Sequence, residues 1–409
     1  METGKTALDI YITANSPGEI SGLATPVIRE IRSRIPQCGV TLVILPCQYA
    51  SGEELSAGGS SGADRCVGIG DLNRILSNPG EKNRAPGLRL VLHLGGDVVF
   101  SIYLSKKLRC PLWIYSSRPR WKLFVDRYFV PDEKALSGFL KRGVKGDKCA
   151  VIGNIALDSV TLNETEEETR AFLGIAPDVS VVTCLTGSRP IEYVGGVRLF
   201  AAVSRIITEK FPRVKVLFPL APTVRDDLFR SALSASGLEW RGDIRVREIS
   251  LGGGRWALVI RDRTLEAINC STLALAVPGT NNLQAAALHV PYIMVLPLDR
   301  ADEYPLDGIL GLLPLWLPGF RRFKRFYIKR LNERTSFVSL PNKMAGRMVA
   351  PEIRGVFESR VVARMAVGLL ESPEARREMS RTFMELTKER GAASRLAEYA
   401  LKFARGEMR

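Results

Sequence analysis

The segment Pro278-Gly279-Thr280-Asn281 has the residue types of a phosphate-binding turn. It follows an apolar run that ends at Val277 and precedes a stretch of helix-forming side chains. Free backbone N–H groups at a helix N-terminus, together with the helix dipole, favour a bound phosphate. Thr280 and Asn281 are equally suited to cap an ordinary turn. The segment alone therefore supports two interpretations, a phosphate cradle and a plain helix cap.

Asp97 is the candidate general base. It comes directly after a predicted buried strand, 88–94, and the pair Gly95-Gly96. A carboxylate just beyond the carboxyl end of a buried strand lies where open α/β sheets bind their ligands. The alternative is that Asp97 is only the N-cap of the helix that follows.

Two further segments carry glycine beside hydroxyl or charged residues after predicted strands. Thr186-Gly187-Ser188-Arg189 follows the predicted strand 179–185, and the segment from Asn15 to Gly22 follows the predicted first strand, 6–14. We expect the segment from Asn15 to Gly22 to be a Gly-rich loop. It resembles a phosphate-cradling turn but lacks the G-x-G-x-x-G order, so as a dinucleotide signal it is weak.

The elements around these segments predict an α/β protein. The stretch 273–298 reads as a strand, a tight turn, a helix at 281–288 and a second strand at 291–296, which is a βαβ unit of a parallel sheet. The second half of the chain repeats the alternation of the first, and Leu251-Gly252-Gly253-Gly254 predicts a hairpin turn. Further strands are predicted at 40–46, 88–94, 111–115, 125–130, 149–152 and 214–219, and helices at 25–34, 194–211 and 264–269.

Composition excludes several classes of protein. The chain has 409 residues, 46% of them hydrophobic, which suits a globular protein of two domains. Its two His, His93 and His289, argue against a histidine metal site or a Ser-His-Asp triad. The seven Cys form no C-x-x-C pair, which is typical of reduced thiols in a cytosolic protein. We predict no signal segment and no membrane-spanning run.

The net charge of +15 favours a polyanionic partner, and much of it gathers in one segment. Residues 309–320 are apolar and broken by prolines, and 321–330 interleave six cations with three aromatics. This pattern favours an anchor on an anionic membrane surface over a buried lid helix or a nucleic-acid contact, and we expect no nucleic-acid partner. The predicted membrane contacts are Leu313, Trp316, Leu317, Phe320, Arg321, Arg322, Lys324 and Arg325.

Five motifs, in the same order along the chain, resemble those of the lipid-A-disaccharide synthase family. Gly18-Glu19-Ile20-Ser21-Gly22 resembles its GE-x-SG loop, and the segment from Leu185 to Arg189 resembles its LPGSR. The segment from Pro278 to Gln284 stands where the family has SGTA-x-LE. The segment from Val338 to Gly346 is close to YVSLPN-x-LAG and is the most specific, while Ile152 to Asp158 resembles VGHPL-x-D. Together these motifs span most of the chain.

The resemblance implies a GT-B fold, with two Rossmann-like domains facing a cleft. The basic apolar, membrane-associating segment would be an insert at about 300–335, and it is longer than the family pattern leads us to expect. Residues 1–170 would form an acceptor-binding domain and 171–360 a UDP-sugar-binding domain. Residues 361–409 would be helices that pack back on the first domain or on a partner subunit. The family also implies a homodimer that exchanges C-terminal segments.

The resemblance further implies an inverting glycosyltransferase of lipid A biosynthesis that uses no metal or cofactor. It would transfer an acylated glucosamine from a UDP-linked donor to a phosphorylated glycolipid, as a cytoplasmic, peripheral protein on the inner face of the cytoplasmic membrane. Asp97 would be the base, and Arg189, the Gly279-Thr280 backbone and Asn342 would hold the diphosphate. The implied donor contacts are Gly187, Ser188, Arg189, Gly279, Thr280, Asn281, Gln284 and Asn342, and the implied acceptor loop is Gly18, Glu19, Ser21 and Gly22.

Departures from the family pattern keep other functions open. Gln284 replaces a Glu expected to hold the donor ribose, Asn154 replaces a His, and Asp97 stands where the family has two carboxylates. One alternative is a GT-B enzyme acting on another lipid-linked sugar or on a UDP-sugar, such as an epimerase. The other is a catalytically inactive membrane-binding relative. Release of UDP in the presence of a lipid acceptor separates these alternatives.

Overall fold

The computed structural model describes residues 8–46, 58–68, 70–71, 88–187, 190–220, 224–242, 246–299, 301 and 319–408, the side chains of 190–192 and 246 excepted. The chain forms two compact units, each described by itself. Unit 1 comprises Met1–Ser159 and Glu389–Arg409, and unit 2 comprises Val160–Lys388. The chain thus leaves unit 1 before residue 170 and returns to it at Glu389, so the segment 361–409 is divided between the two units.

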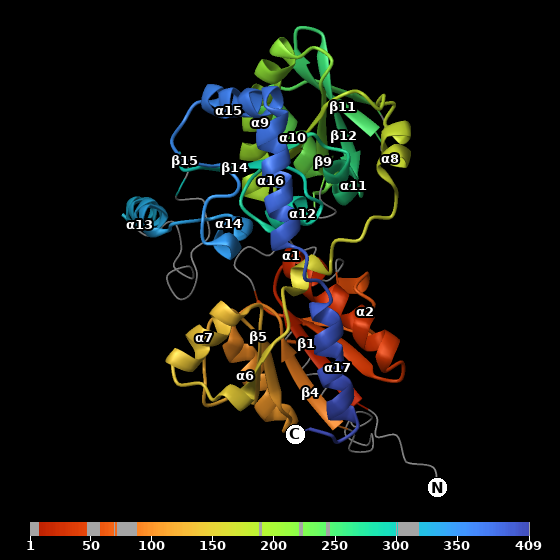
Figure 1. Cartoon of the computed structure of the whole chain (residues 1–409), viewed down its shortest axis with the longest axis vertical. Coiled ribbons are helices and arrows are strands. Elements are labelled where there is room, and N and C mark those ends of the chain that lie inside the picture. Colours follow the sequence, from red (N-terminus) through yellow and green to blue (C-terminus); the bar gives the residue numbers. More distant parts are fainter. Residues whose placement is uncertain are drawn as a thin grey trace. The chain divides into compact units, whose positions relative to one another are not determined.

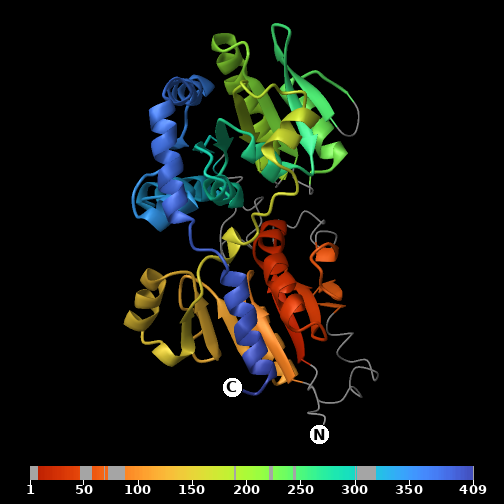
Figure 2. The same cartoon turned by 45° about the vertical axis from the view of Figure 1, so that its right-hand side comes forward.

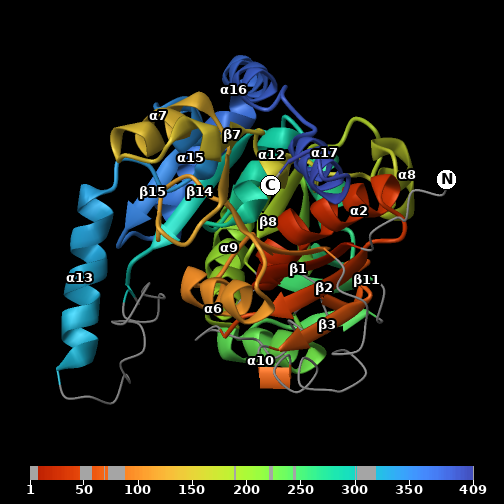
Figure 3. The ribbon, with the colours of Figure 1, turned by 90° about the horizontal axis from the view of Figure 1, so that it is seen from below.

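Unit 1 is built on a parallel sheet with the strand order β3-β2-β1-β4-β5-β6-β7. Figure 3 shows β1, β2 and β3 side by side. The strands are β1 (Leu8–Ala14), β2 (Gly39–Ile44), β3 (Arg65–Gly68), β4 (Leu88–His93), β5 (Leu112–Tyr115), β6 (Arg127–Val130) and β7 (Cys149–Val151). Near-continuous apolar sequence is typical of such strands, because helices cover both faces of a parallel sheet.

The helices of unit 1 divide between the two faces of this sheet. The C-terminal helix α17 lies beside α2 on one face (Figure 2), where Leu396 and Ala400 join the core around Ile10. On the other face Leu104 of α6 and Phe139 of α7 pack around Tyr128. The helices are α1 (Pro17–Glu19), a π-helical turn η1 (Ile20–Ala24), α2 (Thr25–Arg34), α6 (Val98–Leu108), α7 (Glu133–Lys141), α17 (Ala392–Ala404) and the 3-10 turns η2 (Gly146–Lys148) and η3 (Ile155–Leu157).

The predicted Gly-rich loop after the first strand is wrong, because the segment is helical from Pro17 onward. Ser16 is the N-cap and accepts a hydrogen bond from the Glu19 amide (3.3 Å), and Pro17 takes the first helical position. The π-helical turn then joins α1 to α2. Such turns are frequent at functional sites. Because α1, the π-helical turn and α2 follow one another without a break, Glu19 lies near the start of one continuous helical segment.

Asp158 links the two chain segments of unit 1. It lies at the end of Met1–Ser159 and contacts helix α17 of Glu389–Arg409. Its carboxylate oxygens accept hydrogen bonds from the amides of Gly391 (2.6 Å) and Ala393 (2.7 Å). Gly391 is the N-cap residue of α17 and supplies no capping side chain of its own. A carboxylate at a helix N-terminus is favourable both as a hydrogen-bond acceptor and toward the helix dipole. The segment from Ile152 to Asp158 thus has a structural role in closing unit 1.

Unit 2 contains a mixed sheet with the strand order β10-β11-β12-β9-β8-β13-β14-β15. Its strands are parallel from β12 to β15, and β10, β11 and β12 pair antiparallel. The strands are β8 (Val181–Leu185), β9 (Lys215–Leu220), β10 (Trp240–Gly242), β11 (Val246–Gly252), β12 (Arg255–Arg261), β13 (Leu273–Ala276), β14 (Tyr292–Pro297) and β15 (Glu352–Gly355).

The βαβ unit and the hairpin predicted for unit 2 are confirmed. β13, α12 (Thr280–Ala287) and β14 fill the stretch 273–298, and the two strands pair in parallel. Gly252, Gly253 and Gly254 form the β11–β12 turn, all with positive φ (83°, 61° and 73°). Glycine adopts that conformation without the steric cost of a Cβ atom, which explains the run of three.

Helices also cover both faces of the unit 2 sheet (Figure 1). Phe200 of α9 and Ala363 of α15 belong to the core on one face, and Ala285 of α12 and Phe383 of α16 to the core on the other. No helix in the described part of the chain is both long and apolar enough to cross a bilayer. The remaining helices are α8 (Glu166–Phe172), α9 (Pro190–Lys210), α10 (Asp226–Ser236), α11 (Thr264–Asn269), α13 (Phe320–Arg334), α14 (Leu340–Ala345), α15 (Ser359–Glu371) and α16 (Pro373–Leu386).

Candidate active site

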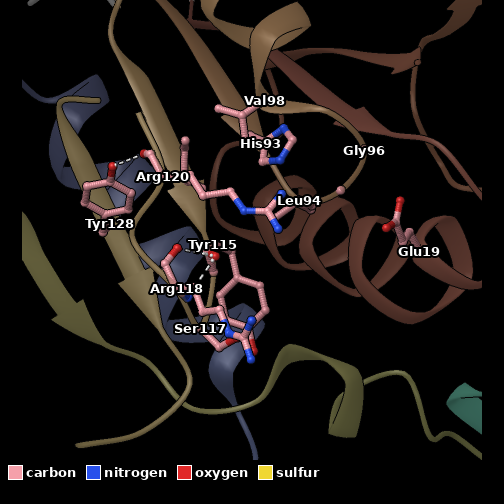
Figure 4. Close-up of a pocket in the computed structure, with 13 residues that line it drawn as sticks. Glu19, His93, Leu94, Gly96, Val98, Tyr115, Ser117, Arg118, Arg120 and Tyr128 are labelled. Atoms are coloured by element: carbon pink, nitrogen blue, oxygen red, sulfur yellow. Dashed lines mark hydrogen bonds between the residues drawn. The ribbon is translucent and has the colours of Figure 1, made fainter. Parts of the chain in front are cut away.

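Unit 1 has a pocket of about 210 Å³ at the carboxyl ends of its central strands. β1 and β4 are neighbours from which the strand order runs outward in opposite directions. Such a topological switch point is where open α/β sheets bind ligands. The pocket is lined by Glu19, His93, Leu94, Gly95, Gly96, Val98, Ile114, Tyr115, Ser116, Ser117, Arg118, Arg120 and Tyr128 (Figure 4).

Glu19 is the residue of the predicted acceptor loop that reaches this pocket. Its Oε2 accepts a hydrogen bond from the Asn15 amide (3.0 Å). A Cβ atom added to Gly95 would lie 2.1 Å from the same oxygen, so the close approach of the carboxylate requires glycine there. Of the other predicted loop residues, Ser21 donates to the Pro17 carbonyl (2.9 Å), and Gly18 and Gly22 lie inside the helical segment.

Asp97 is the N-cap of α6. Its Oδ1 accepts a hydrogen bond from the Val99 amide (3.0 Å), and the side chain is exposed. Its neighbours Gly96 and Val98 line the pocket of unit 1, whereas Asp97 itself stands beside it. The capping role weighed from the sequence is thus observed. A role as base remains a prediction.

His93 supports the pocket from within the protein. Its Nδ1 lies 3.0 Å from Thr13 Oγ1 and 2.8 Å from Ser101 Oγ, and the ring is buried. Burial lowers the pKa of His93 to about 4; the Asp97 carboxylate opposes that shift and the Arg120 guanidinium adds to it. The imidazole is therefore neutral near pH 7 and adds no charge to the pocket. Its partner Thr13 comes from a distant part of the chain, so the sequence carried no signal for this role.

The depressed pKa of His93 predicts an acid-sensitive fold. Between about pH 6.5 and pH 4 the unfolded chain binds a proton that the folded chain excludes, so the free energy of unfolding falls as the pH falls through this window. From pH 7 to pH 4.5 we expect His93 to account for a loss of about 2 kcal/mol. Urea unfolding at both pH values should show a smaller loss in His93→Gln. Equal losses in the two proteins would contradict the assignment.

The switch point of unit 2 lies between β8 and β13, and two of the predicted donor segments follow these strands. Gly187 comes directly after β8 with φ 90°, while Ser188 and Arg189 lie outside the described residues. After β13, Gly279 is the N-cap of α12 and no side chain caps the helix. Gly279 and Thr280 are exposed, so the first N–H groups of α12 face solvent. Among the described residues no side chain provides the plain cap. The phosphate cradle is compatible with this arrangement and stays a prediction.

Two buried amide oxygens near the start of α12 have no hydrogen-bond partner among the described residues. They are Oδ1 of Asn282 and Oε1 of Gln284. Asn282 is fully buried, and its Nδ2 donates to the carbonyls of Val277 (3.0 Å) and Gly279 (3.2 Å), which shapes the turn. Buried polar atoms are rarely left unsatisfied in native proteins, so both oxygens fit acceptors for ligand hydroxyl or N–H groups. The sequence pointed to Gln284 but not to Asn282.

Comparison with known proteins supports the resemblance to the lipid-A-disaccharide synthases at the level of sequence. A family profile described as Lipid-A-disaccharide synthetase matches residues 128–300. The lipid-A-disaccharide synthase of Salmonella arizonae is 25% identical over 398 residues, which covers 90% of this chain and 91% of the relative. That of Syntrophus aciditrophicus is 25% identical over 313 residues, covering 73% and 70%.

The chain is similar to the lipid-A-disaccharide synthases over most of its length, and to the family profile over residues 128–300.

Solved structures agree on the fold predicted from the sequence. UDP-GlcNAc 2-epimerase from Neisseria meningitidis bound to UDP-GlcNAc matches with a TM-score of 0.57 at 14% identity, covering 96% of this chain and 99% of the other. The S. aureus MnaA-UDP co-structure matches with a TM-score of 0.61 at 12% identity, covering 98% of both chains. The predicted α/β GT-B fold of two Rossmann-like units is thereby confirmed. The sequence comparisons thus point to the lipid-A-disaccharide synthases, and the solved structures show the fold.

The family's SLPN motif has a structural role here, which corrects the assignment of Asn342 to the diphosphate. Asn342 is fully buried. Its Nδ2 donates to the Ala350 carbonyl (2.9 Å) and to Glu352 Oε1 (2.8 Å). Its Oδ1 accepts from the amides of Val349 (2.8 Å) and Ala350 (2.9 Å). Because a side-chain amide offers two donors and an acceptor oxygen with two lone pairs, no capacity remains for a phosphate.

The predicted membrane segment is partly corrected. Phe320 and Lys324 are buried, at 7% and 3% exposure, because they share the inward stripe of α13 with Ile328. Arg321, Arg322 and Arg325 are exposed as predicted, and Leu313, Trp316 and Leu317 lie outside the described residues. The exposed apolar residues of α13 are instead Phe323, Phe326, Tyr327 and Leu331.

Proposed function

We propose that this protein is a divergent lipid-A-disaccharide synthase, which transfers an acylated glucosamine from a UDP-linked donor to a phosphorylated glycolipid acceptor. The observation that carries the proposal is the exposed, uncapped N-terminus of α12 next to the unpartnered oxygens of Asn282 and Gln284. That arrangement suits a diphosphate beside a group with hydroxyls to donate. Fold neighbours solved with UDP and UDP-GlcNAc, and relatives named as lipid-A-disaccharide synthases, support the substrate class.

The reaction is a single displacement at the anomeric carbon of the donor sugar. An acceptor hydroxyl oxygen forms the new bond to this carbon while its bond to the UDP oxygen breaks, which inverts the configuration. Asp97 takes the hydroxyl proton, and UDP leaves with the bonding electron pair. The N–H groups and dipole of α12 stabilise the charge that grows on the leaving diphosphate. Arg189 adds a cation there, and Gln284 Oε1 accepts from a ribose hydroxyl.

Release of UDP tests this proposal. Purified protein is mixed with a UDP-linked acylated glucosamine and with a detergent-dispersed, phosphorylated acylglucosamine. We expect UDP and a disaccharide lipid to appear in equal amounts, and only when both substrates are present. Isomerisation of the donor without an acceptor would instead identify an epimerase. UDP binding without release in any mixture would identify an inactive relative, and either result would overturn the proposal.

The proposal includes residence on the inner face of the cytoplasmic membrane, where such a lipid acceptor is found. Helix α13 lies at the edge of unit 2, near β15 and α14 (Figures 1 and 3). Its exposed surface combines Phe326, at 68% exposure, with Tyr327 and a set of cations. The exposed cations are Arg321, Arg322, Arg325, Lys329, Arg330 and Arg334. Aromatic residues beside clustered cations suit the interface of an anionic bilayer.

Replacing three of these cations is expected to weaken membrane binding. Each cation near an anionic surface is worth about 1 kcal/mol, so Arg321→Gln, Arg322→Gln and Lys329→Gln together should lower vesicle partitioning about 100-fold. Sedimentation with vesicles of anionic phospholipid measures this effect. The control carries the same charge change on unit 1 at the exposed residues Lys134, Lys141 and Lys145. Equal losses in the two triple variants would show that only net charge matters.

A further inference from the structure

We infer that Arg118 and Arg120 form a phosphate-binding subsite in the pocket of unit 1, and that it holds the phosphate of the sugar acceptor. The inference rests on the proposed transfer reaction for the identity of the acceptor. The subsite itself follows from the geometry of unit 1. The family motifs assign no residue to this role.

The two arginines are adjacent along a loop that leaves the sheet at the pocket. Arg118 and Arg120 follow β5 and both line the pocket, with Pro119 between them. In Figure 4 they lie on one side of the pocket and Glu19 lies on the other. A ligand in the pocket therefore meets two guanidinium groups on one side and a carboxylate on the other.

The backbone that carries the arginines is fixed on both sides of Pro119. Ser116 Oγ accepts from the Arg118 amide (3.1 Å) and donates to the Arg118 carbonyl (2.9 Å). Tyr128 Oη donates to the Arg120 carbonyl (2.5 Å). Pro119 restricts its own φ angle. The loop is thus ordered before a ligand arrives, which lowers the entropic cost of binding.

The charge of the pocket favours an anion. Neither guanidinium group makes a hydrogen bond or an ion pair with any residue that the structure describes. The pocket lining contributes these two cations against the single carboxylate of Glu19, since His93 is neutral near pH 7. Guanidinium groups match phosphate oxygens in a two-pronged geometry, which a lysine ammonium does not.

A phosphorylated sugar fits this arrangement better than a simple anion. Its phosphate would lie against Arg118 and Arg120, and its hydroxyl groups would extend across the pocket toward Glu19 and the Gly95-Gly96 turn. A volume of about 210 Å³ accommodates one sugar ring with its phosphate. The pocket would thereby orient the acceptor before transfer.

The experiment measures binding rather than turnover. A hexose 1-phosphate is titrated into the full chain by calorimetry, with the free hexose as the matched ligand and with saturating UDP present to fill the nucleotide site. We expect the phosphate ester to bind and the free hexose to bind at least about tenfold more weakly. Arg118→Gln and Arg120→Gln should each weaken binding of the phosphate ester about tenfold, and Lys at either position should restore only part of it.

The control variant is Lys134→Gln, which removes an exposed cation of unit 1 outside the pocket and should leave binding unchanged. Thermal unfolding of each variant confirms that the exposed substitutions leave the fold intact. Unchanged binding in the Arg118→Gln/Arg120→Gln double variant would overturn the subsite. A repeat titration without UDP gives a second test, because ester binding that appears only when UDP is left out would place the ester in the nucleotide site. A chain that binds the ester through these arginines yet releases no UDP with any acceptor keeps the subsite and refutes the transferase.

Discussion

Asn342→Ala is expected to lower the free energy of unfolding by at least about 4 kcal/mol. The substitution leaves the Ala350 carbonyl and the amides of Val349 and Ala350 without partners, and the Glu352 carboxylate loses a donor. Each buried group left unsatisfied costs roughly 1–3 kcal/mol, more for a charged one. The Glu352 side chain is fully buried, so no water replaces the lost bond there. Urea unfolding of the purified variant measures the change.

Asn281→Ala provides the matched control for this prediction. Asn281 belongs to the same set of predicted donor contacts, is only half-buried and makes no side-chain hydrogen bond in the described part of the chain. Its replacement should change the free energy of unfolding by less than about 1 kcal/mol. If Asn342→Ala instead unfolds like the wild-type chain but loses UDP affinity, the amide contacts the diphosphate after all.

Asp97→Asn is expected to lower the rate of UDP release about 10²- to 10⁴-fold, which is the usual contribution of a general base. The substitution removes the carboxylate but keeps the helix cap, because Asn is as good an N-cap as Asp and can still accept a hydrogen bond from the Val99 amide. Stability should therefore change little, and UDP binding should be retained. Single-turnover measurement of UDP release, with UDP affinity measured separately, isolates the chemical step.

Glu19→Gln is the comparison that decides between the two carboxylates at this sheet edge. Glu19 lines the pocket of unit 1 and Asp97 stands beside it, capping α6. Gln retains an acceptor for the Asn15 amide, so the helical start should persist. Full activity in Asp97→Asn together with a loss of about 10²-fold or more in Glu19→Gln would move the base to Glu19.

The secondary structure around α12 was predictable because its signals are local. An apolar strand, a Pro-Gly turn and a second apolar strand agree within one short stretch, and the structure has β13, α12 and β14 there. The loop predicted after β1 is wrong because Gly18 and Gly22 favour a loop only by their local propensity. The N-cap at Ser16 and Pro17 at the first helical position outweigh the low helix propensity of those glycines.

The motif from Val338 to Gly346 resembles the family most closely, yet its Asn342 does not supply the ligand contact that the motif predicts. Residues 338–346 match the family motif well, yet the Asn342 amide donates hydrogen bonds to the Ala350 carbonyl and to Glu352 of β15. A pattern of residue types does not state whether a polar side chain faces a ligand or the core. That distinction depends on which distant backbone groups arrive beside it.

The sequence by itself determined the α/β class, the two successive halves and the resemblance to the lipid-A-disaccharide synthases, because these depend on local periodicity and on motifs in a fixed order. Only the tertiary structure decided which residues meet. Strand order puts β1 beside β4 and brings Glu19 to the same pocket as Arg118 and Arg120. It also leaves the start of α12 exposed while burying Asn342. Contacts between residues far apart in the chain follow from sheet topology, which no short stretch of sequence specifies.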